Sequence, residues 1–116
     1  MTEPLKLLFI CSRNRIRSLT AERLFSHVPG LDVRSAGTQL GARIVVGPGH
    51  LRWADFILVM EKAHLRKLQE RFPDEIEGKQ VVALHIPDDY VFDQPELRDE
   101  LWSRVAEVVD LPDPPE

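Results

Sequence analysis

The sequence is short of cysteine: Cys11 is the single one among 116 residues. One cysteine cannot form a disulfide within the chain, and a lone thiol is typical of proteins in the reducing cytoplasm. We therefore expect a cytoplasmic location and a chemical rather than a structural use for Cys11. Long apolar runs are also missing, because no stretch approaches the roughly 18 residues that span a bilayer. The first residues, which include Glu3, do not resemble a secretory signal, so we expect no membrane segment.

Positive charge is scarce as well, because 15 Lys and Arg stand against 19 Asp and Glu, for a net charge of −4. This balance disfavours general binding to nucleic acid. The charge is uneven, since residues 1–53 hold eight basic and three acidic side chains while residues 54–116 hold seven and sixteen. The basic first part can attract an anionic substrate to one local site. The histidines show no metal-ligand spacing, and we predict neither a metal nor a cofactor. They are His27, His50, His64 and His85.

Alternating apolar runs and helical patterns predict the fold class. The predicted strands are residues 5–10, 31–36, 56–60 and 81–84. The predicted helices run from Ser18 to before Pro29, through residues 65–72 up to Pro73, and from Pro95 to Val108 or Val109. Residues 39–52, rich in glycine, are predicted to be mostly loop with a short helix. Buried strands that alternate with helices favour an α/β three-layer sandwich with a four-stranded parallel sheet. We place one domain at residues 1–110 and predict a flexible C-terminal tail at 111–116.

The octapeptide between the first strand and the first helix carries the strongest functional signal. It reads Cys11-Ser12-Arg13-Asn14-Arg15-Ile16-Arg17-Ser18. A loop wrapped around a tetrahedral anion can point its N–H groups at the anion's oxygens, and a helix N-terminus adds partial positive charge. In parallel sheets, functional sites lie beyond the carboxyl ends of the strands, which is where this loop falls. We therefore predict a phosphate-binding loop after strand 1, which inorganic phosphate or sulfate can occupy.

The residue types in the loop suggest covalent catalysis. A thiol in the positive field at the start of the loop favours the thiolate, so Cys11 is the candidate nucleophile. Arg17 at the end of the loop can hold two phosphate oxygens at once, which a lysine does less well. Ser18 can cap the helix or donate a hydrogen bond to the thiolate. The remaining loop residues are candidates for substrate binding, and they are Ser12, Arg13, Asn14, Arg15 and Ile16.

The same octapeptide resembles the phosphate-binding loop of the low-molecular-weight protein tyrosine phosphatases. The shared pattern is a cysteine, two residues, an asparagine, two residues, an arginine and a serine. Further similarity follows in order at residues 33–38, 42–43, 54–60 and 86–90, so that the chain looks like a short member of the family. The resemblance implies a metal-independent phosphomonoester hydrolase that acts through a phosphocysteine intermediate.

The resemblance also implies roles outside the loop. Asp88, two residues before Tyr90, would be the general acid, and Tyr90 would line the mouth of the pocket. Asn14 would brace the loop through Ser35. Phosphotyrosine in proteins is the substrate that the family suggests. Arg13 stands where the family commonly has glycine, and the segment after Thr38 is short. These departures leave room for another anionic phosphate ester, and they do not exclude a nucleotide or a nucleic-acid terminus as substrate.

Three other functions fit parts of the pattern. Some arsenate reductases share this fold and loop, and one that relies on an external small thiol fits a chain without further cysteines. A phosphocarrier subunit of sugar transport also has a cysteine after the first strand, but such carriers generally lack an arginine at the position of Arg17. A non-catalytic phosphate-binding module would not need both Cys11 and Asp88. Phosphatase activity is therefore the main hypothesis.

Overall fold

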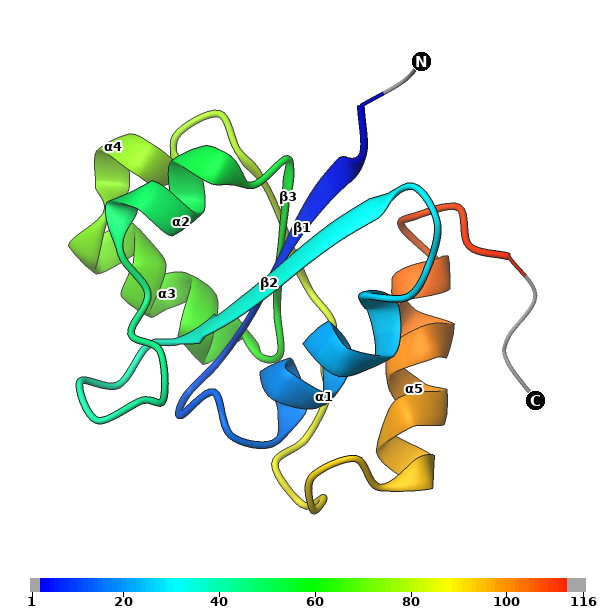
Figure 1. Ribbon diagram of the computed structural model, residues 1–116. Helices are drawn as coiled ribbons and strands as arrows, with labels where there is room; N and C mark the ends of the chain where they lie inside the picture. Colours follow the sequence, from blue (N-terminus) through cyan, green and yellow to red (C-terminus); the bar gives the residue numbers. More distant parts are fainter. Residues whose placement is uncertain (1–2, 113–116) are drawn as a thin grey trace.

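Four parallel strands and five helices form the three predicted layers in the computed structural model, which describes residues 3–112. The strands are β1 (Leu5–Cys11), β2 (Leu31–Gly37), β3 (Phe56–Val59) and β4 (Gln80–Ala83), in the spatial order β2-β1-β3-β4. The helices are α1 (Arg17–Phe25), α2 (Pro48–Trp53), α3 (Lys62–Arg71), α4 (Pro73–Ile76) and α5 (Pro95–Ala106). Helices α1 and α5 cover one face of the sheet, and α2, α3 and α4 cover the other (Figure 1). The fold class predicted from the sequence is confirmed.

Strand β1 builds both halves of the core, because successive side chains of a strand point to opposite faces. Leu7 and Phe9 belong to the buried cluster under α1 and α5. Leu8 and Ile10 belong to the cluster under α2, α3 and α4. In the first cluster the ring of Phe9 stacks on Phe25, with centroids 5.5 Å apart. A strand buried on both faces has to be apolar throughout, which explains the continuous run in the sequence.

Several boundaries differ from the sequence-based expectation. Pro73 ends one helix as predicted, but it also begins the short helix α4, since proline fits the first helical position. The short helix expected within residues 39–52 is α2. Helix α5 stops at Ala106, and Val109 is buried in the turn that follows instead of on the helix. Of the predicted tail, residues 111–112 have no regular structure and 113–116 lie outside the described residues.

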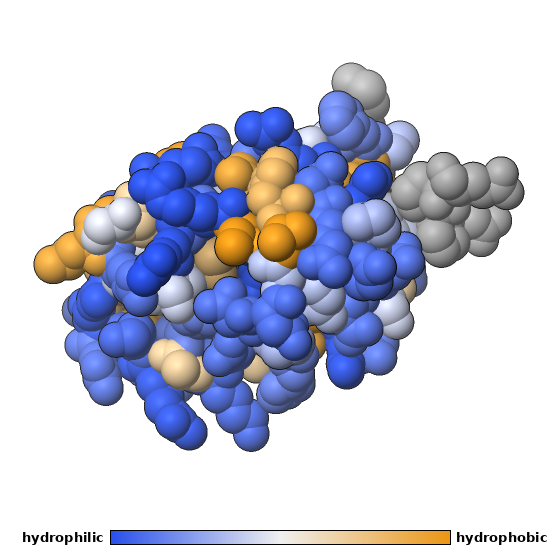
Figure 2. All heavy atoms as spheres, turned by 90° about the horizontal axis from the view of Figure 1, so that it is seen from below, coloured by the Kyte–Doolittle hydropathy of each residue, from blue (hydrophilic) through white to orange (hydrophobic). Residues whose placement is uncertain are grey.

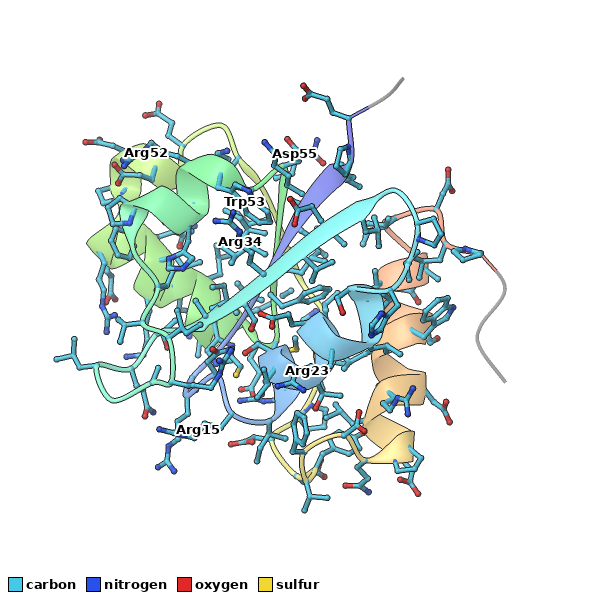
Figure 3. The ribbon with its side chains drawn as sticks, viewed as in Figure 1. Arg15, Arg23, Arg34, Arg52, Trp53 and Asp55 are labelled. Atoms are coloured by element: carbon cyan, nitrogen blue, oxygen red, sulfur yellow. The ribbon has the colours of Figure 1, made fainter. Side chains whose placement is uncertain are left out.

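The surface is hydrophilic over most of the face shown in Figure 2, with a few small hydrophobic groups. Large hydrophobic side chains that are exposed come from two loops, and they are Leu40, Ile44, Val45, Val91 and Phe92. Trp53 is half-buried, and the guanidinium of Arg34 lies 4.2 Å from the centre of its ring (Figure 3). Within residues 3–112, no helix has the length and apolar character that a bilayer crossing requires.

Candidate active site

The loop that joins β1 to α1 lies at the carboxyl edge of the sheet. Strand β1 has β2 on one side and β3 on the other, so the chain first builds the sheet outward to β2 and then passes back across β1 to build the other side from β3. Ligands bind at this kind of switch point in open parallel sheets. Helix α1 begins at Arg17, and its N-terminal end adds partial positive charge to the loop.

Asn14 gives the loop its turn. Its backbone lies in the left-handed region, with φ 57°, which asparagine tolerates better than most residues. The side chain is fully buried, and Nδ2 donates to Ser18 Oγ (2.7 Å) and to Ser35 Oγ (2.8 Å). Ser35 in turn donates to the carboxylate of Glu22 at 2.7 Å. Arg13 does not have a positive φ, so an arginine fits where the resemblance led us to expect glycine.

A strap formed by residues 38–43 holds the outer side of the loop. Four consecutive loop carbonyls accept hydrogen bonds from it. The pairs are Thr38 N with Cys11 O (3.0 Å), Gln39 N with Ser12 O (3.0 Å), Arg43 N with Arg13 O (3.0 Å) and Arg43 Nε with Asn14 O (3.1 Å). The C=O and N–H of one peptide unit point in opposite directions. The N–H groups of the loop therefore face away from the strap, and together they form a cradle of donors for an anion.

Gly37 lets the strap approach the loop. A Cβ atom at this position would lie 2.6 Å from the Ser12 carbonyl oxygen and 2.7 Å from Ala42 Cβ. Both distances are shorter than any side chain tolerates, and the first involves backbone that cannot move aside. Glycine at the end of β2 is therefore required by packing between two backbones.

The sulfur of Cys11 faces two hydrogen-bond donors. The Asn14 N–H donates to Sγ at 3.3 Å, and Ser18 Oγ lies 2.9 Å away. Because Ser18 Oγ already accepts from Asn14 Nδ2, its own hydrogen is free to point at the sulfur. An acceptor with two converging donors is the environment that suits a thiolate.

Arg17 is 97% buried in spite of its charge, and it is held from one side. Its Nη1 donates to the Ile86 carbonyl at 2.9 Å and to the carboxylate of Glu61. The carboxylate supplies the opposite charge that a buried guanidinium needs. Both partners bind the same nitrogen, Nη1. The Nε and Nη2 atoms form the edge that can bind an oxyanion bidentately, and this edge stays available for a ligand.

A cleft of about 320 Å³ lies over the cradle. Its lining residues are Cys11, Ser12, Arg13, Arg15, Ile16, Arg17, Gln39 and Asp88. Asp88 comes from the loop after β4, and its Oδ1 is 3.7 Å from Arg17 Nε. That separation is too long for a hydrogen bond, and Asp88 is 65% exposed. The candidate nucleophile, arginine and acid predicted from the sequence therefore meet in one cleft.

Three of the candidate binding residues do not line this cleft. Asn14 and Ser18 are buried behind the loop, where they contact the sulfur and each other. Tyr90 is half-buried and packs against the core cluster under α1 and α5. The exposed side chains of Arg13 and Arg15 lie at the cleft, and neither forms an ion pair with another residue in the range 3–112.

His64 was not singled out from the sequence, yet its ring touches the loop. Nδ1 accepts from the N–H of Glu61 at 3.0 Å, and Nε2 lies 3.0 Å from Ser12 Oγ. Burial, and then the nearby charge of Arg17, lower the pKa of His64 to about 4. The ring is therefore neutral near pH 7. In the part of the chain that the structure describes, no group of three potential ligands could hold a metal ion.

The comparisons with known proteins point in one direction. No protein-family model matches the chain. A curated protein-arginine-phosphatase from Geobacillus stearothermophilus is 28% identical over 95 residues, which cover 61% of this chain and 64% of that relative. The solved YwlE arginine phosphatase of the same organism superimposes with a TM-score of 0.68 at 26% identity, covering 90% of this chain and 92% of the other.

A second solved structure extends the likeness. The tyrosine phosphatase Wzb from Escherichia coli K30, in complex with phosphate, gives a TM-score of 0.71 at 25% identity and covers 88% of this chain and 94% of its own. In fold, and at 25 to 28% identity in sequence, the chain is similar to phosphatases of the low-molecular-weight protein tyrosine phosphatase type. The family resemblance first seen in the octapeptide is thus confirmed over most of the fold.

The likeness to these phosphatases does not explain every residue of the site. Glu61 and His64 were missed because their partners, Arg17 and Ser12, are 44 and 52 residues away in the sequence. A signal was present, because Glu61 follows the end of β3 almost as directly as the loop follows β1. Polar residues at the carboxyl end of any parallel strand are candidates for the same site. Gln39 was missed because it lies in the strap, whose path the sequence did not predict.

Proposed function

We propose that this chain is a cysteine-dependent phosphatase that removes phosphoryl groups from protein side chains. The observation that carries the proposal is the position of Cys11 Sγ, which lies beneath a cleft lined by Arg17 and Asp88. The sulfur has two converging donors, the arginine has a free edge, and the carboxylate approaches from a different loop. These are the parts that nucleophilic catalysis at phosphorus needs.

In the first step the Cys11 thiolate attacks phosphorus, an S–P bond forms, and the bond from phosphorus to the leaving group breaks. Arg17 and the N–H cradle hold the non-bridging oxygens while charge spreads over them. Protonated Asp88 gives its proton to the leaving atom. Asp88 is preferred to Asp89 because Asp88 lines the cleft, whereas Asp89 is exposed and does not.

In the second step water attacks the phosphocysteine, and the Asp88 carboxylate takes a proton from that water. The S–P bond breaks, inorganic phosphate forms, and the thiolate returns. Ser18 assists by donating its hydrogen bond to the departing sulfur. The two steps return each residue to its initial state, so the cycle needs no metal, reductant or cofactor.

Two observations favour a protein as the phosphorylated substrate. Leu40 and Val91 are 86% and 66% exposed, next to the cleft residue Gln39 and just beyond Asp88. Apolar side chains beside a polar cleft suit contact with a polypeptide. The relatives are phosphatases named for tyrosine and for arginine, so phosphotyrosine and phosphoarginine are the two candidate substrates. None of the relatives named above supports a nucleic-acid substrate.

Arg13 and Arg15 suggest that the preferred substrate carries further negative charge beside the phosphate. Both guanidinium groups are exposed at the cleft on a loop that the strap fixes from behind. Phosphorylated residues with acidic neighbours would meet this charge. We further propose that residues 1–110 act as one domain and that the protein works in the cytoplasm, where its one thiol stays reduced.

The test is hydrolysis of 4-nitrophenyl phosphate near pH 6 in EDTA, with wild type and Cys11→Ser compared. We expect activity that resists the chelator and is lost in the variant, followed by release of phosphate from a phosphotyrosine or a phosphoarginine peptide. Wild type that is inactive on all three substrates would contradict the proposal, as would equal activity in Cys11→Ser. Arsenate reduction with an added thiol, in a chain without phosphatase activity, would favour the reductase hypothesis instead.

A further inference from the structure

His64 has two hydrogen bonds that the proposed reaction does not require. His64 lies in the first turn of α3 and is 97% buried, and its ring joins the start of that helix to the cradle. On one side the Glu61 backbone N–H donates to Nδ1, and on the other Nε2 lies 3.0 Å from Ser12 Oγ. A histidine that only filled the core would not need both contacts.

The first contact fixes the tautomer of the ring. A backbone N–H can only donate, so Nδ1 must present its lone pair to Glu61. The buried ring is neutral near pH 7 and carries one proton. That proton is therefore on Nε2, and the N–H at this position donates to Ser12 Oγ.

The second contact then determines where the serine hydrogen can go. Ser12 Oγ accepts from His64, so its hydrogen must point at a different acceptor. Within residues 3–112 the Ser12 hydroxyl has no other hydrogen-bond partner, and Ser12 lines the cleft beside Cys11 and Arg17. We propose that His64 is a positioning residue that holds the Ser12 hydroxyl as a hydrogen-bond donor directed at the phosphoryl oxygens in the cleft. The inference rests on the proposed function for its ligand.

A hydroxyl that is already oriented loses less conformational entropy on binding an anion than a freely rotating one. A free serine rotates among three wells and loses that freedom when it binds an anion. The hydrogen bond from His64 orients the hydroxyl before the ligand arrives, so less affinity is lost. The cradle then offers a side-chain donor in addition to the backbone N–H groups and Arg17.

Three substitutions separate positioning from helix capping. Ser12→Ala removes the donor, and Ser12→Thr keeps a hydroxyl. In His64→Asn, the shorter side chain places an amide oxygen near the position of Nδ1, where it can still accept from Glu61. It has no atom that reaches Ser12. His64→Asn therefore keeps the contact that supports α3 and breaks the one that orients the serine.

The experiment is calorimetric titration of each variant, and of the double variant Ser12→Ala/His64→Asn, with inorganic phosphate. We expect roughly ten-fold weaker binding in Ser12→Ala and in His64→Asn, since both lose one donor to a charged ligand. The double variant should bind no more weakly than Ser12→Ala, and Ser12→Thr should bind as wild type does. In the wild type, ¹⁵N NMR of the imidazole should show the proton on Nε2.

Additive losses in the double variant would overturn the inference, because His64 would then act without Ser12. Unchanged affinity in both single variants, or a proton on Nδ1, would do the same. Calorimetry does not require turnover, so the two proposals can fail separately. A chain that binds phosphate with this pattern but hydrolyses nothing would contradict the proposed function alone, and a chain that binds no phosphate would contradict both.

Discussion

The two walls of the cleft are built in opposite ways. In the cradle, Asn14, Arg17 and Ser18 are all at least 97% buried, and four successive carbonyls are bonded to the strap. In the loop after β4, residues 87–89 are exposed, and Asp88 reaches the cleft with 65% of its side chain open to solvent. The phosphoryl group has the same shape in every substrate, so a rigid cradle can bind it. The leaving group differs from one substrate to the next, so the side of the cleft that receives it can be open.

The largest effect should come from changing the charged group of the rigid wall. Arg17→Lys replaces a planar fork with a point charge that cannot bond Ile86 O and still offer two parallel donors to phosphate. We expect kcat/KM on an aryl phosphate to fall about 10³-fold. Arg66→Lys, an exposed control on α3, should retain wild-type kinetics. Equal activity in the two variants would contradict the role of the fork.

The open wall should be less demanding, and its contribution should depend on the leaving group. Asp88→Asn removes the proton donor, so kcat on phenyl phosphate should fall about 10²-fold. The loss should be smaller on 4-nitrophenyl phosphate, which departs without full protonation. Asp89→Asn is the matched control and should have little effect. If Asp89→Asn were the more damaging change, the assignment of the acid would be wrong.

The strap can be tested through the glycine that lets it approach. Gly37→Ala places a methyl group 2.6 Å from the Ser12 carbonyl, and we expect the free energy of unfolding to fall by about 2 kcal/mol. Gly49→Ala, within α2, meets no atom within 4 Å and should be neutral or slightly stabilising, since alanine favours helix. Urea denaturation measures both. Matching stabilities would show that the strap can shift away at little cost.

The buried histidine should make stability depend on pH. The lowered pKa of His64, about 4 against an ordinary 6.5, arises from burial first and from Arg17 second; Lys67 also lowers it, while Glu61 and Asp88 oppose the shift. Between these values the unfolded chain binds a proton that the folded chain does not. The difference between the two pKa values is equivalent to roughly 3 kcal/mol, which solvent screening reduces to about 2 kcal/mol. Stability should therefore fall by that amount as the pH drops from 6.5 to 4, and it should not fall further on this account at lower pH.

Comparison with variants isolates that contribution from the acidic residues that titrate in the same range. Urea denaturation at a series of pH values should give a shallower slope for His64→Asn than for wild type. His27→Asn, at an exposed site after α1, should keep the wild-type slope. A slope unchanged by His64→Asn would mean that the ring is not held neutral.

The smallest effect should come from the exposed rim. Arg15 lies at the opposite end of the molecule from Arg52 (Figure 3), which makes Arg52→Ala a matched control. Arg15→Ala should raise KM for an acidic phosphopeptide about three-fold at low salt and have less effect at high salt, because exposed charges are screened. Neutral phosphopeptides should not distinguish the two variants. A similar loss on both peptides would argue against charge recognition.

The rigid wall was predictable from the sequence to the extent that it is local. The octapeptide, its place between β1 and α1, and the four-stranded parallel sheet all follow from neighbouring residues and short-range patterns. The contact of Asn14 with Ser35, which the family resemblance implied, is present at 2.8 Å. Asp88 was proposed from its spacing to Tyr90, and the structure places it at the cleft.

The rest depends on contacts that no local pattern encodes. The strap belongs to the glycine-rich segment, and its register on the loop is set by hydrogen bonds between residues about 27 to 30 positions apart. Glu61 and His64 look like ordinary residues at a helix start until the packing of α3 brings them to Arg17 and Ser12. Tyr90 was expected at the pocket mouth, but its ring packs on the core.

The bond from Arg17 to the Ile86 carbonyl has a thermodynamic consequence. It joins the side chain that would bind an anion to the backbone two residues before Asp88. Anion binding by Arg17 and ordering of the Asp88 loop are therefore thermodynamically coupled. Whatever steadies the acid loop must raise the affinity for the anion, and an anion that steadies Arg17 must steady the loop by the same amount. Loosening of that loop and departure of the product would then be reciprocal parts of a single equilibrium.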